Sequence, residues 1–485
     1  MDPLERVRRA YDPELFRTRG HELVDRLADY LRRATSGATP VLPWKEPREQ
    51  LSAWPAAFPS AAEFVDVVQR AITESHHLHH PRYVGHQVTA PLPEAALADL
   101  VSAMLNNGTA VYEMGPVSTA MERALARFLT NAVGFPEGAD GIFTSGGSVG
   151  NLTALAAARQ AKAGFDAWSL GTTKGPPLAY LVSKETHYSV ARALAIMGLG
   201  EEGATPVPVD DRYRMRPEAL AQAKRDAEAQ GRKVIAVVAS AGSTSTGAFD
   251  PLDAVADFCA AHDLWLHVDG AHGASAVLSP THGPRLKGVS RADSIVWDAH
   301  KMMLMPALVT AVLFRDGKRS YQAFAQEASY LFDGRPLEEE WFNGANRTLE
   351  CTKLMMGMKL YVALALHGPE FFADYVDGMF GLSSRFAERI ASSPDFELAV
   401  RPDCNIVCFR HLRPGLAGLR LDELQDAVRG ALVREGSFYL VKTRLPAGVF
   451  LRVTIINPFT RDQDLAELLD AVRARASRHL EGASP

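Results

Sequence analysis

The chain has 485 residues, of which 47% are apolar and 22% are charged, and its formal net charge is −5. This length is too great for one ordinary core, so we expect a globular protein with two or three subdomains. The lack of a basic block argues against nucleic acid as a partner, and the lack of an apolar run of 18 residues argues against a membrane-spanning helix.

The N-terminus, "MDPLERVRRAYDPELF", is charged and lacks the apolar stretch of a signal peptide. The spacing of the four cysteines fits neither a disulfide framework nor a zinc site. These cysteines are Cys259, Cys351, Cys404 and Cys408. We therefore expect the protein in the reducing cytoplasm.

Helical patterns and a linker make up the first 90 residues. Residues 14–33 place four large side chains on one helical face. Proline and glycine interrupt residues 34–47, which predicts an extended linker, and residues 61–75 return to a helical pattern. We assign residues 1–90 to an N-terminal helical segment.

Helix and strand patterns alternate over the middle of the chain. Helices are predicted at 94–106, 117–132, 148–163, 216–230 and 252–262. Strands are predicted at 178–183, 234–240, 264–269 and 294–297. This alternation predicts βαβ units, so we expect residues 91–370 to form a large α/β domain with a mainly parallel sheet and helices on both faces.

The pattern changes after residue 370. Residues 396–411 and 448–458 resemble antiparallel strands, and residues 421–435 and 462–479 have helical periodicity. We expect residues 371–485 to form a smaller α+β domain.

Two features of the middle segment suggest ligand binding. Asp269 ends a predicted strand, at the edge where α/β sheets bind ligands. In "FTSGGSVGNLTALAAAR", residues 143–159, two glycines and a serine open a helix whose backbone N–H groups could face a phosphate. Each has a plainer explanation, because such an aspartate is more often a turn or cap residue and such glycines often form a simple turn.

Two further residues follow strands of the same domain. His187 comes shortly after the strand at 178–183, and Lys301 follows the strand at 294–297. A lone histidine is more often structural and most lysines are exposed, but a lysine near a dry pocket can form a Schiff base with a carbonyl. Together the four features predict a pyridoxal phosphate site, with a phosphate cradle, a ring-stacking histidine, a partner for the pyridine nitrogen and a Schiff-base lysine.

With these residues the chain resembles the group II pyridoxal-phosphate-dependent amino acid decarboxylases. The resemblance extends from "HPRYVGHQVTAP" to "LRVTIINP". "HKMM", "YEMGPVS" and "ASYLF" look most like the glutamate and cysteine-sulfinate branch, whereas "TSGGS..N" and "NIVCFR" are widespread in the group. The resemblance implies the type I, aspartate-aminotransferase-like fold and a homodimer whose active sites lie at the interface.

The resemblance also implies roles for the cofactor residues. Lys301 is the Schiff-base lysine, Asp269 keeps the pyridine nitrogen protonated, and His187 and Ala271 lie on opposite faces of the ring. The remaining implied cofactor residues are Gly146, Gly147 and Ser148 at the phosphate, Thr244 near the cofactor and His300 beside Lys301.

The reacting amino acid has implied contacts of its own. Tyr330, on a loop, is the implied proton donor to the substrate carbon after CO2 leaves. Arg452 matches an arginine that glutamate decarboxylases direct at a carboxylate, which favours a small acidic substrate. Gln87 and Thr89 fall in the segment that lines the pocket, and the unusual His86 lies beside them.

The expected reaction is therefore decarboxylation of glutamate, aspartate or cysteine sulfinate. Alternatives are decarboxylation of 2,4-diaminobutyrate or an aromatic amino acid, an aminotransferase or decarboxylating oxidase on the same fold, and a binding protein without activity. The chain departs from the family pattern at Gly270, His272, Asp298 and Lys353, and Asp298 replaces a frequent asparagine. We expect no metal, although "HHLHHP" at 76–81 contains clustered histidines.

Overall fold

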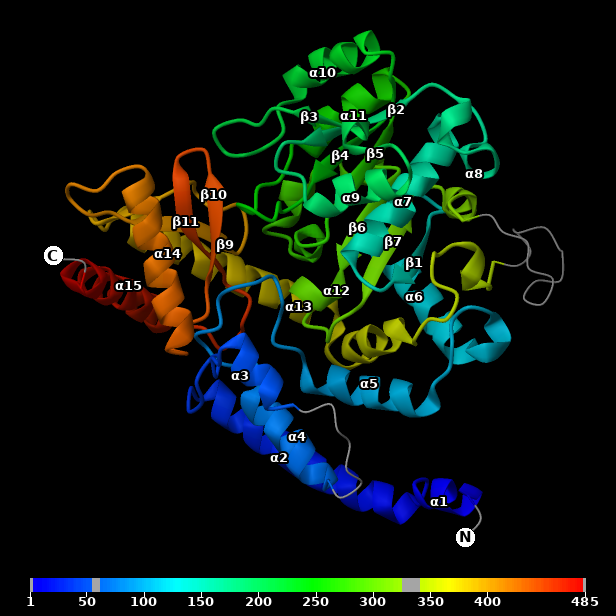
Figure 1. Cartoon of the computed structure of the whole chain (residues 1–485). Coiled ribbons are helices and arrows are strands. Elements are labelled where there is room, and N and C mark those ends of the chain that lie inside the picture. The colour runs from blue at the N-terminus through cyan, green and yellow to red at the C-terminus, as the bar shows by residue number, and fades with distance from the viewer. Residues whose placement is uncertain (1–2, 55–61, 325–340, 483–485) are drawn as a thin grey trace. The chain divides into compact units, whose positions relative to one another are not determined.

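The computed structural model describes residues 3–54, 62–324 and 341–482 (Figure 1). The chain divides into two compact units. The first unit consists of Met1–His86, Arg385–Ala399 and Cys408–Pro485, and the second of Gln87–Ser384 and Val400–Val407. The three-part division expected from the sequence stays a prediction.

A seven-stranded sheet forms the centre of the second unit, in the order β1-β7-β6-β5-β4-β2-β3 (Figure 1). Its strands are β1 (Asp140–Thr144), β2 (Leu178–Ser183), β3 (Ala204–Val207), β4 (Lys233–Ser240), β5 (Trp265–Asp269), β6 (Ser294–Asp298) and β7 (Thr310–Phe314). The pairs from β3 to β6 are parallel, whereas β7 runs antiparallel to both β1 and β6. The predicted mainly parallel α/β sheet is confirmed.

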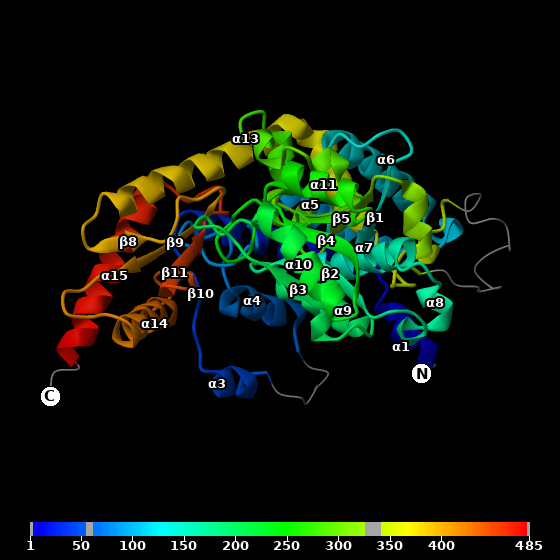
Figure 2. The same cartoon turned by 90° about the horizontal axis from the view of Figure 1, so that it is seen from above.

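The central strands are buried along their whole length, because helices cover the sheet. Every residue of β2, β5 and β6 is buried, and such strands appear in a sequence as continuous apolar runs. Helix α7 (Gly147–Lys162) packs along α9 (Tyr188–Ile196) and on strands β4 to β7 (Figure 2). It approaches closely at Gly150, where an added Cβ would lie 3.2 Å from side chains of β6 and β7.

The remaining helices of the second unit agree with the predicted ones to within one or two residues where a helix was predicted. They are α5 (Pro93–Leu105), α6 (Pro116–Ala132), α8 (Ala167–Leu170), α10 (Pro217–Ala229), α11 (Leu252–Ala261) and α12 (Ala299–Met302). Short 3-10 turns occur at Tyr112–Met114, Thr172–Lys174, Glu201–Gly203, Ala274–Leu278, Gly283–Leu286, Val289–Arg291, Gly317–Gln322 and Gly344–Asn346. The long α13 (Met356–Ala391), which was not predicted, is broken at Gly368, whose φ is 73°, just before Pro369.

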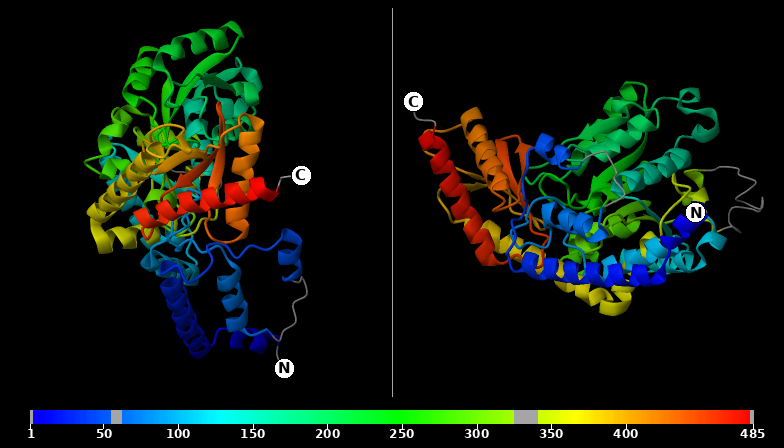
Figure 3. Two further views of the ribbon diagram at one scale, coloured as in Figure 1. Left: turned by 90° about the vertical axis from the view of Figure 1, so that its left-hand side faces the viewer. Right: turned by 60° about the horizontal axis from the view of Figure 1, so that its bottom comes forward.

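The first unit contains helices and a four-stranded sheet. The strands, in the order β10-β11-β9-β8, are β8 (Phe396–Leu398), β9 (Ile406–His411), β10 (Val441–Leu445) and β11 (Gly448–Thr454). The helices are α1 (Pro3–Arg9), α2 (Pro13–Thr35), α3 (Pro47–Ser52), α4 (Phe64–Glu74), α14 (Leu419–Arg434) and α15 (Asp462–Gly482). Helix α14 packs on β11 and against α15, and α2 lies along α4 (Figure 3). Among the described residues, no helix is long and apolar enough to cross a membrane.

Gly273 lets the turns after β4 and β5 approach each other. A Cβ at this position would lie 2.5 Å from the carbonyl oxygen of Ala241 and 2.6 Å from the Phe249 ring. Because one of these atoms is backbone, the clash cannot be relieved by moving a side chain. We expect Gly273→Ala to lower the free energy of unfolding by about 1–3 kcal/mol, measured by urea denaturation.

Gly283→Ala is the matched control, since its nearest neighbour would be 3.5 Å away. It should change the free energy of unfolding by less than about 0.5 kcal/mol. Equal stability of the two variants would contradict the close approach at Gly273.

Candidate active site

A cavity of about 340 Å³ lies at the carboxyl ends of β1, β2, β4, β5 and β6 in the second unit. This is the edge at which α/β sheets bind ligands. All nine residues predicted to bind the cofactor line this cavity, namely Gly146, Gly147, Ser148, His187, Thr244, Asp269, Ala271, His300 and Lys301. The structure thus brings together residues that are far apart in the sequence.

The glycine-rich turn between β1 and α7 is shaped for an anion. Gly146 has a φ of 112°, which side-chain-bearing residues rarely adopt, and no side chain caps the helix that follows. The first turn of α7 contains no acidic residue. The N–H groups at this helix start therefore suit a phosphate.

Asp269 is a buried carboxylate without an ion-pair partner among the described lysines and arginines. Its Oδ1 accepts a hydrogen bond from the backbone N–H of Ala271 at 3.2 Å, and its Oδ2 accepts one from Asn151 at 3.0 Å. The side chain is 9% exposed, and no described lysine or arginine forms an ion pair with it. Since a buried charge needs an opposite charge, a protonated pyridine nitrogen would complete this site.

A chain of buried hydrogen bonds supports Asp269 from behind. Trp265 Nε1 donates to Ser294 Oγ at 2.9 Å, and Ser294 Oγ lies 2.8 Å from His267 Nδ1. His267 Nε2 lies 2.9 Å from Asn151 Oδ1, and the Asn151 amide nitrogen donates to Asp269. Because the Asn151 oxygen must accept, this chain assigns the Nε2–H tautomer to His267. Burial lowers the pKa of His267 to about 4, which keeps the ring neutral.

The same asparagine connects Asp269 to His187. Asn151 also donates to Ser189 Oγ at 2.9 Å, so the Ser189 hydroxyl is left to donate to His187 Nδ1, 2.8 Å away. His187 Nδ1 is therefore an acceptor, and the ring proton lies on Nε2. Burial lowers the pKa of His187, which favours this neutral form. His187 enters the site as a neutral ring with one N–H donor.

Lys301 is paired inside the cavity. It lies in the single turn of α12, and its Nζ is 3.1 Å from Asp298 Oδ2. The Thr310 hydroxyl donates to the other oxygen of Asp298 at 2.5 Å. His300 packs beside the pair, with its Nδ1 3.0 Å from the carbonyl oxygen of Val309. Lys301, three residues beyond the end of β6, is thus compensated by the carboxylate that ends this strand.

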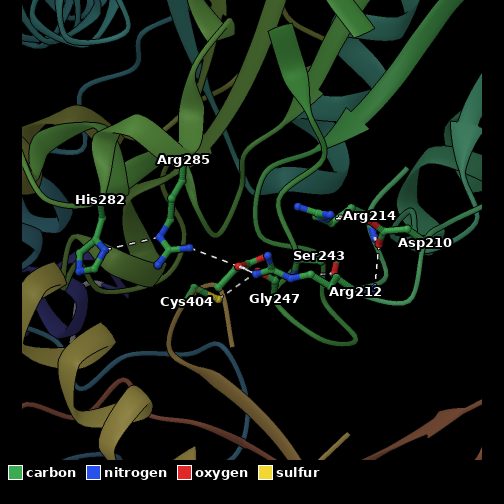
Figure 4. A network of polar contacts seen from close by, with 10 residues as sticks. Asp210, Arg212, Arg214, Ser243, Gly247, His282, Arg285 and Cys404 are labelled. Carbon is green, nitrogen blue, oxygen red and sulfur yellow. Dashed lines mark hydrogen bonds and ion pairs between the residues drawn. The ribbon is translucent and has the colours of Figure 1, made fainter. Parts of the chain in front are cut away.

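A polar network fixes the loop that contains Thr244 (Figure 4). The Cys404 thiol donates to the carbonyl oxygen of Gly247 at 3.4 Å, and Ser243 Oγ lies 3.2 Å from Thr246 Oγ1. Neighbouring Asp403 accepts hydrogen bonds from Arg212 and Arg285. The loop is therefore tied to residues 400–407 within the same unit.

The four residues predicted to contact the substrate fall into different units. Gln87 and Thr89 belong to the second unit, and His86 and Arg452 to the first, so their common pocket stays a prediction. Gln87 is 8% exposed, and its amide nitrogen has no hydrogen-bond partner among the described residues. Such a buried donor is available for a ligand.

Arg452 and His86 lie near one another within the first unit. Burial lowers the pKa of His86, and the charges of Arg452 and Arg429 lower it further. Arg452 is buried, and its guanidinium donates to Thr454 Oγ1 at 3.3 Å. The positive charges gathered here favour an anionic partner.

One predicted site residue is not described by the structure, and several residues of the site were not predicted. Tyr330 lies outside the described residues. The residues that sequence reasoning missed are Asn151, Ser189, His267, Ser294 and Thr310. His267 could have been found, because residues two apart on a strand share a face and His267 precedes Asp269 by two. In the described part of the chain, no three histidine, cysteine or acidic side chains are grouped to bind a metal ion.

Comparison with known proteins decides the family. The model of the pyridoxal-dependent decarboxylase conserved domain matches residues 47–412. The chain belongs to this family.

Similar proteins extend the agreement over nearly the whole chain. Cysteine sulfinic acid decarboxylase of Mus musculus is 32% identical, covering 90% of this chain and 91% of that protein. Acidic amino acid decarboxylase GADL1 of Bos taurus is 31% identical, covering 92% of this chain and 88% of that protein. The crystal structure of mouse CSAD matches with a TM-score of 0.89 and 30% identity, covering 96% of this chain and 99% of that chain.

These findings confirm the type I fold, the pyridoxal phosphate cofactor and an amino acid decarboxylase. The site has the features that this cofactor requires, namely an uncapped helix start, an aspartate without a protein cation and a lysine in the cavity. The roles of the individual residues remain predictions.

The buried His267 should leave a measurable pH signature in this decarboxylase. Its pKa is lowered from 6.5 to about 4 in the folded protein. The stability it contributes is fully present above pH 6.5 and is lost as the pH falls toward 4, by at most roughly 1.4 kcal/mol per pH unit. We expect His267→Gln, which keeps a polar side chain, to remove this part of the pH dependence of the unfolding free energy.

The difference between variant and wild type is the quantity to measure. Burial raises the pKa of Asp250 to about 7, so the stability it contributes is lost as the pH rises toward 7, which is the opposite sign. Asp250 contributes equally to both proteins and cancels in the difference. An unchanged slope in His267→Gln would refute the assignment.

Proposed function

We propose that this enzyme converts a small acidic L-amino acid, namely glutamate, aspartate or cysteine sulfinate, into the amine and CO2. The observation that carries the reaction is the single cavity lined by Lys301, Asp269 and His187. The substrate class is supported by the names of the relatives and by the positive charges of Arg452 and Arg429 near His86.

Different residues of the chain would contact different parts of the cofactor. Bound pyridoxal phosphate supplies an electron sink for the electron pair left when CO2 departs. Lys301 would hold the cofactor covalently, the start of α7 would bind its phosphate, and Asp269 would keep its pyridine nitrogen protonated. That preorganised charge lowers the barrier without reorganisation during the reaction.

His187 and Tyr330 are proposed as hydrogen-bond and proton donors to the cofactor ring or the substrate. Because Nδ1 of His187 accepts from Ser189, its Nε2–H is the donor available to the ring or to the substrate. Tyr330 is proposed as the proton donor to the substrate carbon, by resemblance alone. A donor at that carbon is what separates amine formation from oxidative release.

Arg452 is proposed to select the acidic side chain of the substrate. A guanidinium binds a carboxylate or sulfinate through two parallel hydrogen bonds. Arg452 and Arg429 both lie close enough to His86 for their charges to lower its pKa. Gln87 and Thr89 are also proposed to contact the substrate.

We further propose a homodimer in the cytoplasm. Helix α5 displays Leu97, Leu100, Val101, Met104 and Leu105, which are 44–59% exposed. Their spacing places them on one stripe of the helix, and a contiguous apolar stripe of this size suits a protein interface. A second copy of the chain is the proposed occupant. The cytoplasmic location rests on the sequence alone.

The function is tested by incubating the purified enzyme and pyridoxal phosphate with a panel of L-amino acids. We expect CO2 and an equal amount of amine from an acidic substrate, and no turnover by Lys301→Ala under the same conditions. CO2 from a diaminobutyrate or aromatic substrate would discard the acidic class. Peroxide and aldehyde would indicate an oxidase, and conversion of the cofactor to its amine form would indicate an aminotransferase.

Arg452→Met tests the substrate class separately, because it removes the charge but keeps much of the volume. We expect kcat/KM for the acidic substrate to fall about 10²- to 10⁴-fold, while cofactor binding, followed by visible absorbance, is unchanged. Arg452→Lys keeps the positive charge but loses the planar guanidinium group. Its kcat/KM should lie between those of the wild type and Arg452→Met. An equal loss for acidic and neutral amino acids would show that Arg452 does not select the side chain.

A further inference from the structure

Asp298 is a buried acid that the proposed function leaves without a role. Its side chain is 2% exposed, and it ends β6 three residues before Lys301. One carboxylate oxygen faces Lys301 Nζ at 3.1 Å, and the other accepts from Thr310 at 2.5 Å. Thr310 comes from β7, the antiparallel neighbour of β6. Two strands thus fix this carboxylate against the reactive lysine.

A carboxylate at position 298 differs in its chemistry from an amide of the same shape. Both groups can accept a hydrogen bond from an ammonium group, but only the carboxylate can take up its proton. A lysine attacks a carbonyl only as the free amine. The residue at position 298 therefore determines whether Lys301 has a base within hydrogen-bond distance.

We propose that Asp298 is the proton partner of Lys301 when the enzyme captures its cofactor, an inference that rests on the proposed function for the role of Lys301. Asp298 Oδ2 takes one proton from the Lys301 ammonium group. The freed electron pair on Nζ forms the bond to the aldehyde carbon of pyridoxal phosphate, and the carbonyl electron pair moves to its oxygen.

The proton balance closes within the pair. The aldehyde oxygen leaves as water, which needs two protons. One is the proton held by Asp298, and the other comes from the attacking nitrogen. Asp298 returns to the ionised state, and the nitrogen bonded to the cofactor keeps one proton and its positive charge. No external acid, base or oxidant is required.

The surroundings of the pair favour this transfer as the phosphate arrives. A Cβ on Gly147 would lie 3.1 and 3.2 Å from the two oxygens of Asp298, so the carboxylate lies directly against the phosphate cradle. An ionised carboxylate there repels a phosphate dianion. Moving the proton onto Asp298 removes this repulsion at the moment when Lys301 becomes nucleophilic.

Other charged groups also face the pair. His300 Nε2 lies 3.5 Å from Asp298 Oδ2, and His187 interacts electrostatically with Asp298, Lys301, Asp269 and Arg192. At the start of the glycine-rich turn, Glu350 accepts from the backbone N–H of Ser145 at 3.0 Å. Of these groups, only Asp298 is within hydrogen-bond distance of Lys301 Nζ in the described structure. It is therefore the nearest proton acceptor.

The test follows cofactor capture by the full-length chain after its cofactor has been removed. Visible absorbance is recorded by stopped flow between pH 6 and pH 9, with pyridoxal phosphate and with pyridoxal, which lacks the phosphate. Each rate is divided by that of Nα-acetyl-lysine with the same aldehyde. Dividing the two rates cancels the effect of pH on the reactivity of the aldehyde itself. Because pyridoxal lacks the phosphate, its rate is free of the repulsion between Asp298 and phosphate.

In the wild type, we expect the rate ratio to be largest at pH 6 and to fall as the pH rises. The free lysine loses about tenfold in rate per pH unit below its pKa of about 10.4, whereas Lys301 has an internal base. Asp298→Asn should capture both aldehydes on the order of 10²-fold more slowly at pH 7, with a rate that rises in parallel with that of the free lysine.

Thr310→Val keeps the carboxylate but removes the hydroxyl that holds it. Because the base is still present, this variant should slow capture less than Asp298→Asn does, and its rate should rise less steeply with pH than that of the free lysine. The proposal is overturned if Asp298→Asn captures pyridoxal as fast as the wild type at pH 7, or if the wild-type rate itself follows that of the free lysine. The second criterion holds even if the variant does not fold. Because no amino acid is present, an error in the substrate class leaves this readout unchanged.

Discussion

The arrangement of the candidate active site depends on the free-energy cost of burying two carboxylates at the carboxyl edge of the central sheet. Five strands end at this edge, and two of them end in carboxylates that are almost fully buried, Asp269 and Asp298. A buried carboxylate without an opposite charge would be protonated or would destabilise the fold. Asp298 finds its cation within the protein, at Lys301. Asp269 finds none among the described residues, and in the proposed site the pyridine nitrogen of the cofactor supplies it.

The hydrogen-bond chain behind Asp269 determines how rigidly the carboxylate of this residue is held. From Trp265 to His187, each donor has one acceptor, and the Asn151 amide sets the direction of the chain. Such a fully satisfied network in a dry interior resists rearrangement, because any rotation would leave a buried group without its partner. The Asp269 carboxylate and, through Ser189, the His187 ring are therefore oriented by the same side chain, that of Asn151. Preorganisation of this kind is the largest contribution that a protein makes to cofactor chemistry.

Many of the strands and site residues could be predicted from the sequence, but the hydrogen bonds between residues far apart in the sequence could not. The strands β2, β4, β5 and β6 were predicted because strands buried on both faces are continuous apolar runs. Strands β1, β3 and β7 were missed, since a segment of four or five residues is too short to show a clear period. The glycine-rich turn, His187, Asp269 and Lys301 were found by their chemistry at strand ends. The bond from His267 to Asn151 joins residues 116 positions apart, and no local pattern reports it.

In the proposed site, the cofactor affects the two buried acids in opposite ways. Cofactor binding adds a cation beside Asp269, which lowers the energy of that carboxylate. The same event brings a phosphate against Asp298 and converts its lysine into a covalent link, which raises the energy of the ionised acid until its proton has moved. One carboxylate is thus stabilised and the other is stressed by the same ligand. In the proposed mechanism, a proton that moves within the Asp298–Lys301 pair relieves that stress without water entering the cavity, and this local relief would let a buried acid be tolerated beside a bound phosphate.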